Sequence, residues 1–524
     1  MNEDSNQGLT LLQKGQKGLV HIIFSRLGLI LLLLAFHIFL MFGVFHWFGK
    51  FLPHIYGGTI LFTVVMVLCL LNSRMDASAK LTWLIVILIL PVFGALLFWY
   101  TKSDLGHRAL KKRMNCLIDQ TRSSISQDGS VMEELKREAP DVAALTRYLG
   151  RTGCYPAYKN TAVTYFPLGE QMWEEMLKQL EKAEHFIFLE YFIVEEGLMW
   201  GKLLELLARK VKQGVEVRVM YDGTCEFSKL PHDYPKRLKA LGIQCKMFAP
   251  VTPFLSTHYN YRDHRKIMVI DGHTAFTGGV NLADEYINHV ERCGHWKDVA
   301  VMLKGDAVKS FTLMFLQTWS INEKQPLFDK YLAYPTFAPK NTSGYVIPYG
   351  DCPLDEDKVG ERVYMDILNR AQRYVHIMTP YLILDNEMET ALKFAAERGV
   401  DVSLILPGVT DSAAAHGLAW THYASLLDSG VKIYEYNPGF VHAKVFVSDD
   451  REAVIGTINM DYRSLYHHFE CAAYLWKADC IPEIEQDFRQ TLSKCVEITH
   501  QTVRKAKFSR KMIGILLKAV APLM

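Results

Sequence analysis

The sequence predicts an α/β protein in which N-terminal transmembrane helices are followed by two tandem α/β domains that share one active site. Three observations lead to this fold class. Apolar residues are concentrated before residue 101, short β-rich runs alternate with helical patterns from about residue 142, and one polar motif occurs twice. A chain of 524 residues is also long enough for two or three domains.

Residues 1–101 contain three apolar runs, and we expect them to form a membrane anchor of two or three transmembrane helices. Run 27–48 has spanning length, run 56–71 is shorter, and run 81–100 carries Pro91, which membrane helices tolerate. The number of spans stays open. Three spans would leave the N-terminus outside although it also carries cations, and one of the first two runs would suit a re-entrant or interfacial segment.

A cationic stretch follows the last apolar run and comprises Lys102, Arg108, Lys111, Lys112 and Arg113. Because such residues flank the cytoplasmic ends of membrane spans, they predict a multi-pass protein of the cell membrane whose catalytic domains are cytoplasmic. Residues 102–141 mix charge runs with Ser-rich and Gly-containing turns, and we expect a juxtamembrane linker with some helix.

Residues 142–335 and 336–502 are predicted to form two domains, because the second half repeats the order of elements in the first. The first half has expected helices at 171–183 and 202–212 and strands at 186–194 and 215–221. The second half has expected helices at 361–373, 386–398 and 416–429 and strands at 374–383, 402–406 and 431–436. Strands that alternate with helices predict a largely parallel sheet with helices on both faces.

Each half contains the spacing H-x-K-x4-D, followed after six residues by G-x-x-N. The first copy is His264, Lys266, Asp271 and Asn281, and the second is His442, Lys444, Asp449 and Asn459. Strand alternation puts the His and the Lys of each copy on one face. A single copy would be a weak signal, but two copies with the same offset are hard to obtain by chance. The competing interpretation is two core strands with snorkelling lysines and satisfied histidines.

The motif residues suit phosphoryl chemistry. An imidazole is a nucleophile at neutral pH because its unperturbed pKa is about 6.5. Its attack on a phosphodiester gives a covalent phosphohistidine, while a second imidazole protonates the leaving alcohol and later deprotonates the incoming one. His264 and His442 fill these roles if the two halves pack about a pseudo-twofold axis. The expected phosphate-binding residues are Lys266, Asn281, Lys444 and Asn459.

Each histidine also needs a carboxylate on its other ring nitrogen to fix its tautomer and orientation. We expect Asp298 to orient His264 and Glu470 to orient His442, because each carboxylate lies downstream in the same half. The motif aspartates Asp271 and Asp449 complete the candidate catalytic set. They end their strands, so we expect them to brace the motif rather than contact phosphate.

Composition argues against several other classes of protein and site. The formal net charge of +2 gives no global basic field, so we expect no nucleic-acid partner. The ten cysteines are scattered without C-x-x-C, which argues against a zinc site or disulfide framework and favours a reducing compartment. No carboxylate cluster has metal spacing and the lysines supply positive charge, so neither a metal nor a cofactor is expected.

Residues 503–524 form a basic amphipathic pattern, with apolar residues at i, i+3, i+4 and i+7 from position 513. A helix of this kind suits the surface of a membrane that contains anionic lipids. By pattern alone, a helix that packs against the preceding domain is an equally good interpretation.

The paired motifs resemble those of the phospholipase D superfamily. Within it, the chain is similar to bacterial cardiolipin synthases through the stretch R-M-D-A-S-A-K-L-T-W…P-V-F-G-A-L-L, the stretch T-P-Y-L-I-L-D and the terminal A-P-L-M. This resemblance covers nearly the whole chain. The motifs end in G-G-V-N and G-T-I-N where G-S-x-N is common in the superfamily, and the apolar run at 27–48 is an extra feature.

The resemblance implies one site built by two phospholipase D domains, a phosphatidyl-histidine intermediate and the conversion of two phosphatidylglycerol molecules into cardiolipin and glycerol. It favours His264 as nucleophile and His442 as acid and base, which the residues themselves leave open. The alternatives are another phospholipid headgroup exchanger or a phospholipase D hydrolase, and a non-catalytic membrane scaffold, which the complete motif sets disfavour. The oligomeric state, the second lipid substrate and the acyl preference cannot be read from the sequence.

Overall fold

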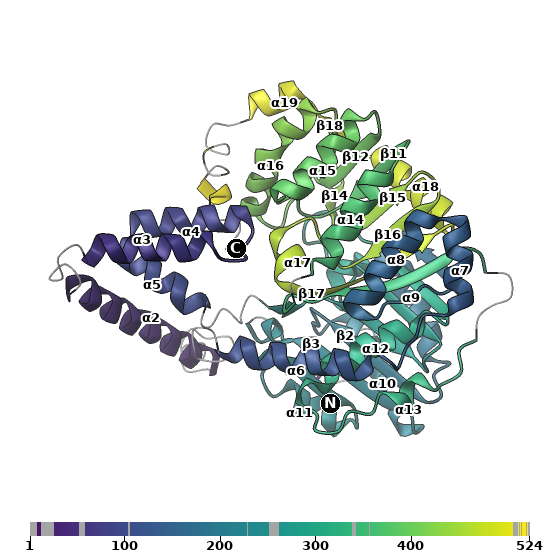
Figure 1. Ribbon diagram of the computed structural model, residues 1–524. Coiled ribbons are helices and arrows are strands. Elements are labelled where there is room, and N and C mark those ends of the chain that lie inside the picture. Colours follow the sequence, from purple (N-terminus) through teal and green to yellow (C-terminus); the bar gives the residue numbers. More distant parts are fainter. Residues whose placement is uncertain are drawn as a thin grey trace.

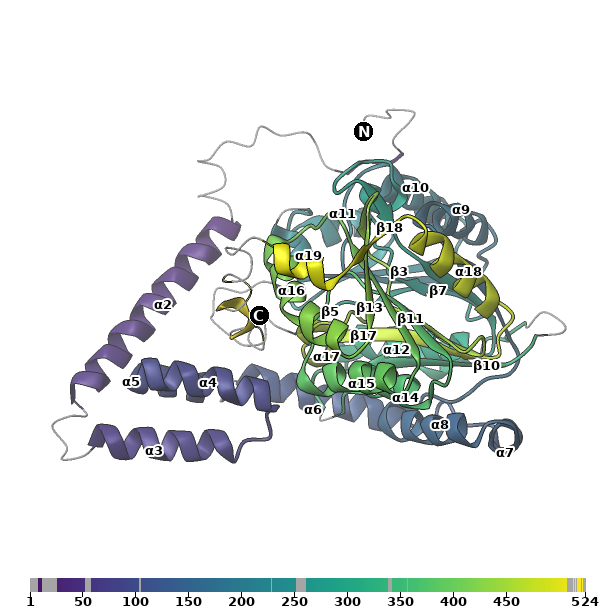
Figure 2. The same cartoon turned by 90° about the horizontal axis from the view of Figure 1, so that it is seen from above.

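The structure is a computed structural model, and its fold consists of an α/β body with an arm of helices (Figure 1). It describes residues 8–11, 26–51, 58–102, 105–227, 229–250, 261–337, 342–355 and 357–506, and residues 512, 514, 516–519 and 521 of the C-terminal segment. Both views show the arm extending from one side of the body (Figures 1 and 2).

The arm consists of helices α2 (Arg26–Phe51), α3 (Gly58–Leu71), α4 (Ala77–Ile89) and α5 (Pro91–Lys102). The run 81–100, predicted to be one helix, is two helices, because Pro91 cannot continue the hydrogen-bond pattern and Leu90 leaves helical geometry with φ −128° and ψ 73°. Among the helices of the described ranges, none combines the length and the apolar character needed to cross a membrane, so the predicted transmembrane helices are not supported there.

The stretch predicted as a linker is largely helical and packs on the body. Its helices are α6 (Leu105–Thr121) and α7 (Gly129–Glu138), and α8 (Pro140–Gly153) follows directly. Arg113 on α6 donates a hydrogen bond of 3.1 Å to the carbonyl of Ile321. Leu135 and Leu149 are fully buried in the core of the second half, although they precede every strand of the first sheet in the chain.

The first half is built on a seven-stranded sheet in the order β1-β9-β7-β6-β2-β3-β4. The strands are β1 (Thr161–Phe166), β2 (Phe186–Tyr191), β3 (Glu216–Asp222), β4 (Gln244–Phe248), β6 (Lys266–Ile270), β7 (Thr274–Gly278) and β9 (Ala300–Gly305). The main helices are α9 (Gly169–Leu180), α10 (Leu198–Lys212), α11 (Tyr234–Ala240) and α12 (Val308–Trp319). The four elements expected in this half are therefore present.

The second half repeats this arrangement in the order β10-β17-β16-β15-β11-β12-β13-β18. The strands are β10 (Tyr345–Asp351), β11 (Tyr374–Met378), β12 (Asp401–Pro407), β13 (Lys432–Tyr436), β15 (Val445–Ser448), β16 (Glu452–Gly456), β17 (His468–Trp476) and β18 (Cys495–Ile498). The helices are α14 (Val359–Arg370), α15 (Asn386–Glu397), α16 (Ala413–Asp428), α17 (Tyr462–Tyr466), α18 (Ile481–Leu492) and α19 (His500–Lys505).

The prediction of a largely parallel sheet was wrong for the strands that carry the motifs. Within each main sheet the parallel pairs described are those of β2-β3-β4 and β11-β12-β13, whereas β6 and β15 each pair with antiparallel neighbours on both sides. The cause is a tight turn after each motif strand. Asp271 and Gly272 have φ of 50° and 70°, and Asp449 and Asp450 have φ of 54° and 57°. Two successive residues with positive φ are typical of a two-stranded hairpin.

Two short parallel ribbons join the halves. In one, β5 (Arg262–Asp263) of the first half pairs with the start of β17, and in the other, β14 (Gly439–Val441) of the second half pairs with β8 (His295–Lys297). Each ribbon immediately precedes a motif histidine in the chain. The ribbons therefore bring the two motifs to the same place between the sheets.

The described part of the C-terminal segment packs on the body and on the arm, which agrees with the second of the two interpretations of its pattern. A Cβ on Gly514 would lie only 2.7 Å from the carbonyl oxygen of Gly417 on α16, so the two backbones are in close contact. Thr82 of α4 donates a hydrogen bond of 2.9 Å to the carbonyl of Ala519. Residues 507–511, with three of the expected cations, lie outside the described ranges.

Candidate active site

The two motif histidines are each bound by a carboxylate from the opposite half. His264 Nδ1 lies 2.9 and 3.0 Å from the two carboxylate oxygens of Glu470, and His442 Nδ1 lies 2.7 Å from Asp298 Oδ2. The structure brings all four predicted residues together, but the predicted pairing within each half was wrong. The crossed ribbons are the physical reason, because β17 places Glu470 beside the first motif and β8 places Asp298 beside the second.

The backbone repeats this crossing. The amide of His264 donates to the carbonyl of Phe469 at 2.9 Å, and the amide of His442 donates to the carbonyl of Lys297 at 2.8 Å. Each imidazole is thus held by the other half through both its main chain and its Nδ1 atom. The remaining nitrogen, Nε2, is the one available to a substrate at each histidine.

Burial sets the protonation state of these groups. It lowers the pKa of His264 to about 3 and that of His442 to about 4, so both imidazoles are neutral near pH 7. Burial alone would raise the pKa of Glu470, but the adjacent imidazole of His264 holds that pKa well below its usual range. The pKa of Asp298 is lowered in the same way by His442, against the effect of its burial. A neutral imidazole beside an ionised carboxylate is the form that nucleophilic attack requires of the attacking histidine.

The motif lysines lie inside the same cluster. Lys266 and Lys444 are each 1% exposed, and each Nζ donates to the carbonyl of the histidine two residues earlier, at 2.6 Å for Lys266. Burial lowers the pKa of Lys266 to about 8 and that of Lys444 to about 7. An anionic substrate would favour the charged form of both lysines.

The motif asparagines are buried but not equivalent. Asn281 accepts a hydrogen bond of 3.0 Å from the amide of Ile193 and donates one of 2.8 Å to the hydroxyl of Tyr286. The Oδ1 atom of Asn459, in contrast, has no hydrogen-bond partner among the residues that the structure describes. The role of these two asparagines in binding phosphate remains a prediction.

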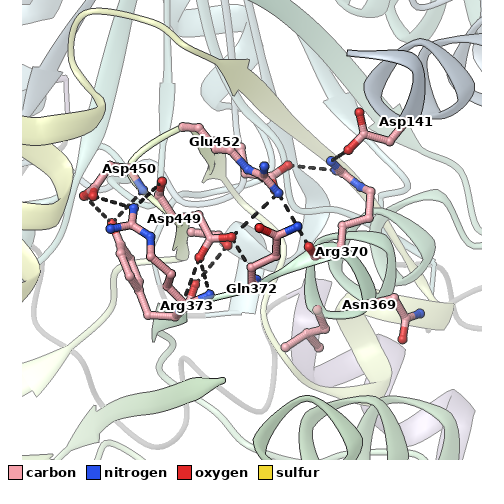
Figure 3. Close-up of polar contacts among 12 residues, drawn as sticks. Asp141, Asn369, Arg370, Gln372, Arg373, Asp449, Asp450 and Glu452 are labelled. Atoms are coloured by element: carbon pink, nitrogen blue, oxygen red, sulfur yellow. Dashed lines mark hydrogen bonds and ion pairs between the residues drawn. The ribbon is translucent and has the colours of Figure 1, made fainter. Parts of the chain in front are cut away.

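The motif aspartates lie at the other ends of β6 and β15, away from the imidazoles. Asp271 accepts hydrogen bonds of 2.7–2.8 Å from the three successive amides of residues 184–186. Asp449 accepts bonds of 2.9–3.0 Å from the amides of residues 372–374, next to the ion pair of Arg373 and Asp450 (Figure 3). Both aspartates brace the turn of a motif hairpin, as expected, and their inclusion in the catalytic set remains a prediction.

His468 belongs to the cluster but was not predicted. Its ring centroid lies 5.4 Å from that of His264, and its Nδ1 lies 3.7 Å from Glu470 Oε1. It is 7% exposed, and neither ring nitrogen has a hydrogen-bond partner in the described ranges. The available signal was its position two residues before Glu470 on one strand, which puts both side chains on the same face.

One group in the described part of the chain brings together donor atoms that could hold a metal ion. It consists of His264, His468 and Glu470, whose donor atoms lie within 4.8 Å of one another. Two imidazoles and a carboxylate are ligands that divalent transition metals accept. The expectation that the reaction needs no metal remains a prediction.

The two motifs differ at one position that contacts the orienting carboxylates. A Cβ on Gly279 would lie 2.0 Å from Asp298 Oδ1, so no side chain fits at that position of the first motif. The equivalent residue of the second motif is Thr457, whose hydroxyl donates a hydrogen bond to Glu470 Oε2. The carboxylate that holds His264 therefore has an additional donor, and the two histidines are not in identical environments.

Comparison with known proteins agrees with this geometry. A family model described as cardiolipin synthase, PLD-like domain, matches residues 176–319 and 364–492, about half of the chain. An uncharacterized protein of Streptococcus mutans serotype c is 57% identical over 87% of this chain and 99% of its own length. Cardiolipin synthase 2 of Bacillus anthracis is 33% identical over 85% of this chain and 87% of its own length.

The fold also matches a solved structure. The phosphatidylserine synthase of Haemophilus influenzae covers 69% of this chain and 93% of its own, with a TM-score of 0.53 and 13% identity. At this identity the likeness concerns the fold alone. The family model and the extended similarity to Bacillus anthracis cardiolipin synthase 2 carry the assignment. This chain belongs to the cardiolipin synthase family with phospholipase D-like domains.

Proposed function

We propose that this protein is a cardiolipin synthase that transfers a phosphatidyl group between two phosphatidylglycerol molecules, reversibly, and yields cardiolipin and glycerol. The observation that carries the proposal is the pair of buried histidines, each fixed through Nδ1 by a carboxylate of the opposite half, with two buried lysines beside them. Membership of the cardiolipin synthase family supports the same reaction.

In the first step, Nε2 of His264 attacks the phosphorus of one phosphatidylglycerol. The bond between phosphorus and the headgroup oxygen breaks, and His442 gives a proton to that oxygen so that glycerol leaves. The product is a phosphatidyl-histidine. Lys266 and Lys444 stabilise the negative charge that builds up on the phosphoryl oxygens.

In the second step, a hydroxyl of another phosphatidylglycerol attacks the same phosphorus. His442 takes the proton of that hydroxyl, the bond between phosphorus and Nε2 of His264 breaks, and cardiolipin forms. The first step needs His442 protonated, although burial lowers the pKa of this group to about 4 in the free protein. The negative charge of a bound phosphodiester favours the imidazolium and so raises that pKa.

The order of the two histidines can be tested by trapping the labelled phosphatidyl-enzyme in His264→Asn and His442→Asn. With His264 as nucleophile, the adduct is absent from the first variant and forms slowly in the second. An adduct in His264→Asn that is missing from His442→Asn would reverse the assignment.

We further propose that the arm places the catalytic body at the cell membrane, with the body in the cytoplasm and two or three membrane-crossing segments within residues 1–101. Most of the strongly exposed large apolar side chains lie between residues 32 and 99, such as Phe39 at 70%, Ile60 at 73% and Leu88 at 62%. Apolar surface of this extent requires a lipid or protein partner. Cysteine labelling from each side of sealed vesicles would determine the topology.

The decisive experiment is product analysis. The purified full chain is reconstituted in phosphatidylglycerol vesicles with a chelator of divalent metals, and lipids and free glycerol are measured. Cardiolipin with an equal amount of glycerol is expected, and the double variant His264→Ala, His442→Ala is expected to produce neither. Phosphatidic acid alone would identify a hydrolase. Loss of activity in the chelator that zinc or magnesium restores would show that a metal takes part.

A further inference from the structure

A cavity of about 290 Å³ lies in the second half, and Asp461, two residues after the motif asparagine Asn459, lines it. Leu382 forms a parallel bridge with Met460, so the chain that leaves β11 runs beside the chain that carries the second motif asparagine. Tyr381 and Asp461, one from each of these segments, line the cavity. The cavity is therefore built from the same two segments that approach the candidate active site.

Both residues connect the cavity to the motif of the second half. The ring of Tyr381 lies 6.4 Å from that of Phe440, which stacks at 5.9 Å on His442. Asp461 is 7% exposed, and its charge acts on Lys444. A ligand in the cavity would thus lie close to the second motif.

The floor of the cavity is apolar and leads toward the arm. Ile383, Leu418 and Ala521 line it, and they also line a neighbouring cavity of about 400 Å³ whose other wall includes Leu81 and Ile85 of α4. Both views place α4 beside α17 and near the C-terminal segment (Figures 1 and 2). Apolar side chains therefore line adjoining cavities from the arm to the segment that follows the second motif.

The rim of the cavity carries one cation. Arg463 lines the cavity and is exposed, and no ion pair joins it to the residues that the structure describes. Asp461 uses Oδ1 to accept a hydrogen bond of 2.8 Å from the amide of Ser464, which fixes its carboxylate at the start of α17. An apolar floor, an unpaired guanidinium and a buried carboxylate are complementary to an acyl chain, a phosphate and hydroxyl groups, respectively.

We propose that this cavity binds the acceptor phosphatidylglycerol, an inference that rests on the proposed function. Arg463 binds the phosphate of the acceptor, the apolar floor contacts the first part of one acyl chain, and the glycerol hydroxyls point past Asp461 to the phosphatidyl-histidine. The acceptor phosphate does not react, so it needs a site separate from the one formed by the lysines.

This arrangement would favour transfer over hydrolysis. Water and phosphatidylglycerol compete for the same intermediate, and an acceptor hydroxyl held close to the phosphorus reacts at a high effective concentration. Filling the cavity should therefore change the ratio of the two products, whereas a general loss of structure would lower both. The ratio of cardiolipin to phosphatidic acid is the appropriate readout.

The test uses the full chain in phosphatidylglycerol vesicles and the variants Ala415→Trp, which fills the cavity from α16, and Arg463→Gln, which removes the cation without disturbing a packed contact. Ala424→Trp is the matched control because Ala424 is exposed and lies on the same helix. We expect the ratio of cardiolipin to phosphatidic acid to fall at least tenfold in Ala415→Trp and about fivefold in Arg463→Gln, and to stay unchanged in Ala424→Trp.

The outcomes separate the two proposals. Unchanged ratios in both cavity variants would overturn the acceptor site, and so would an equal fall of both products in each of them. Wild-type protein that yields only phosphatidic acid would overturn the proposed function and the acceptor site with it. Cardiolipin from the wild type together with shifted ratios in the variants supports both.

Discussion

At the scale of single residues, the histidines are prepared for catalysis by partners that lie far away in the chain. Each imidazole uses Nδ1 for a carboxylate and presents Nε2, and burial keeps it neutral near pH 7. The sequence predicted the two histidines from the repeated spacing and the two carboxylates from their positions downstream of it. It could not predict which carboxylate meets which histidine, because that depends on how the two sheets face each other.

The crossed pairing predicts distinct effects for the two carboxylates. Glu470→Gln should lower the rate of adduct formation by about 10³-fold, since an amide can favour the wrong tautomer of the nucleophile His264. Asp298→Asn acts on His442 and should slow the second step as well, so that adduct accumulates. Rapid-quench measurement of the labelled adduct distinguishes the two variants. Accumulation of the adduct in Glu470→Gln instead would contradict the pairing of Glu470 with the nucleophile.

The buried lysines predict an alkaline limit to activity. A lysine is cationic only below its pKa, and burial lowers this value to about 8 for Lys266 and about 7 for Lys444. As the pH rises through 7 to 8, the two lysines of the free protein lose their positive charge. Above this range, kcat/KM should fall about tenfold per pH unit for each lysine whose charge the reaction needs. Bound phosphate raises both pKa values, so kcat should persist to higher pH. Equal pH profiles for kcat and kcat/KM would contradict this.

At the scale of elements, the hairpin that follows each histidine supports the motif. Asp271 and Asp449 bind three successive amides at the start of the neighbouring strand, which fixes the register of β6 on β2 and of β15 on β11. The expected helices and strands of both halves were correct within a few residues. The parallel sheet was not, because tight turns at Asp271-Gly272 and Asp449-Asp450 make each motif strand antiparallel to the strand that follows it.

Removal of one brace should destabilise the fold more than removal of a nearby surface charge. Asp449→Ala leaves buried amides without an acceptor and should lower the free energy of unfolding by about 2–4 kcal/mol. Asp450→Asn is the matched control, because its ion pair with Arg373 is more than half exposed and the solvent screens it. Denaturant unfolding of both variants checks the difference. Equal effects would show that the brace has no special role.

At the scale of the whole molecule, the site is a property of both halves together. Through the ribbons β5-β17 and β14-β8, each half supplies one carboxylate to the histidine of the other half. The sequence predicted two domains and one site from the duplicated motif. It did not predict that α7 in the expected linker and α8 at the start of the expected first domain pack in the core of the second, since a solvated linker and a packed helix can share one composition.

The crossed pairing of carboxylates and histidines predicts which pairs of substitutions have coupled effects on activity. In a double-mutant cycle, Asp298→Asn should add little to the loss of activity in His442→Gln, because the carboxylate acts through that histidine. When Asp298→Asn is combined with Glu470→Gln, the loss of activity should equal or exceed the sum of the two single losses. Steady-state rates of cardiolipin formation give the coupling energies. Strong coupling of Asp298 to His264 and not to His442 would contradict the crossed arrangement.

The crossed pairing of carboxylates and histidines also has a consequence for synthesis of the protein on the ribosome. Glu470 follows His264 by 206 residues, so a growing chain carries the nucleophile long before the group that orients it. At about 5–20 residues per second, this interval lasts on the order of 10–40 s. During this time the nascent chain has no complete centre and cannot attack the lipids of the membrane beside which it is made. Activity begins only when the last strands have joined the fold.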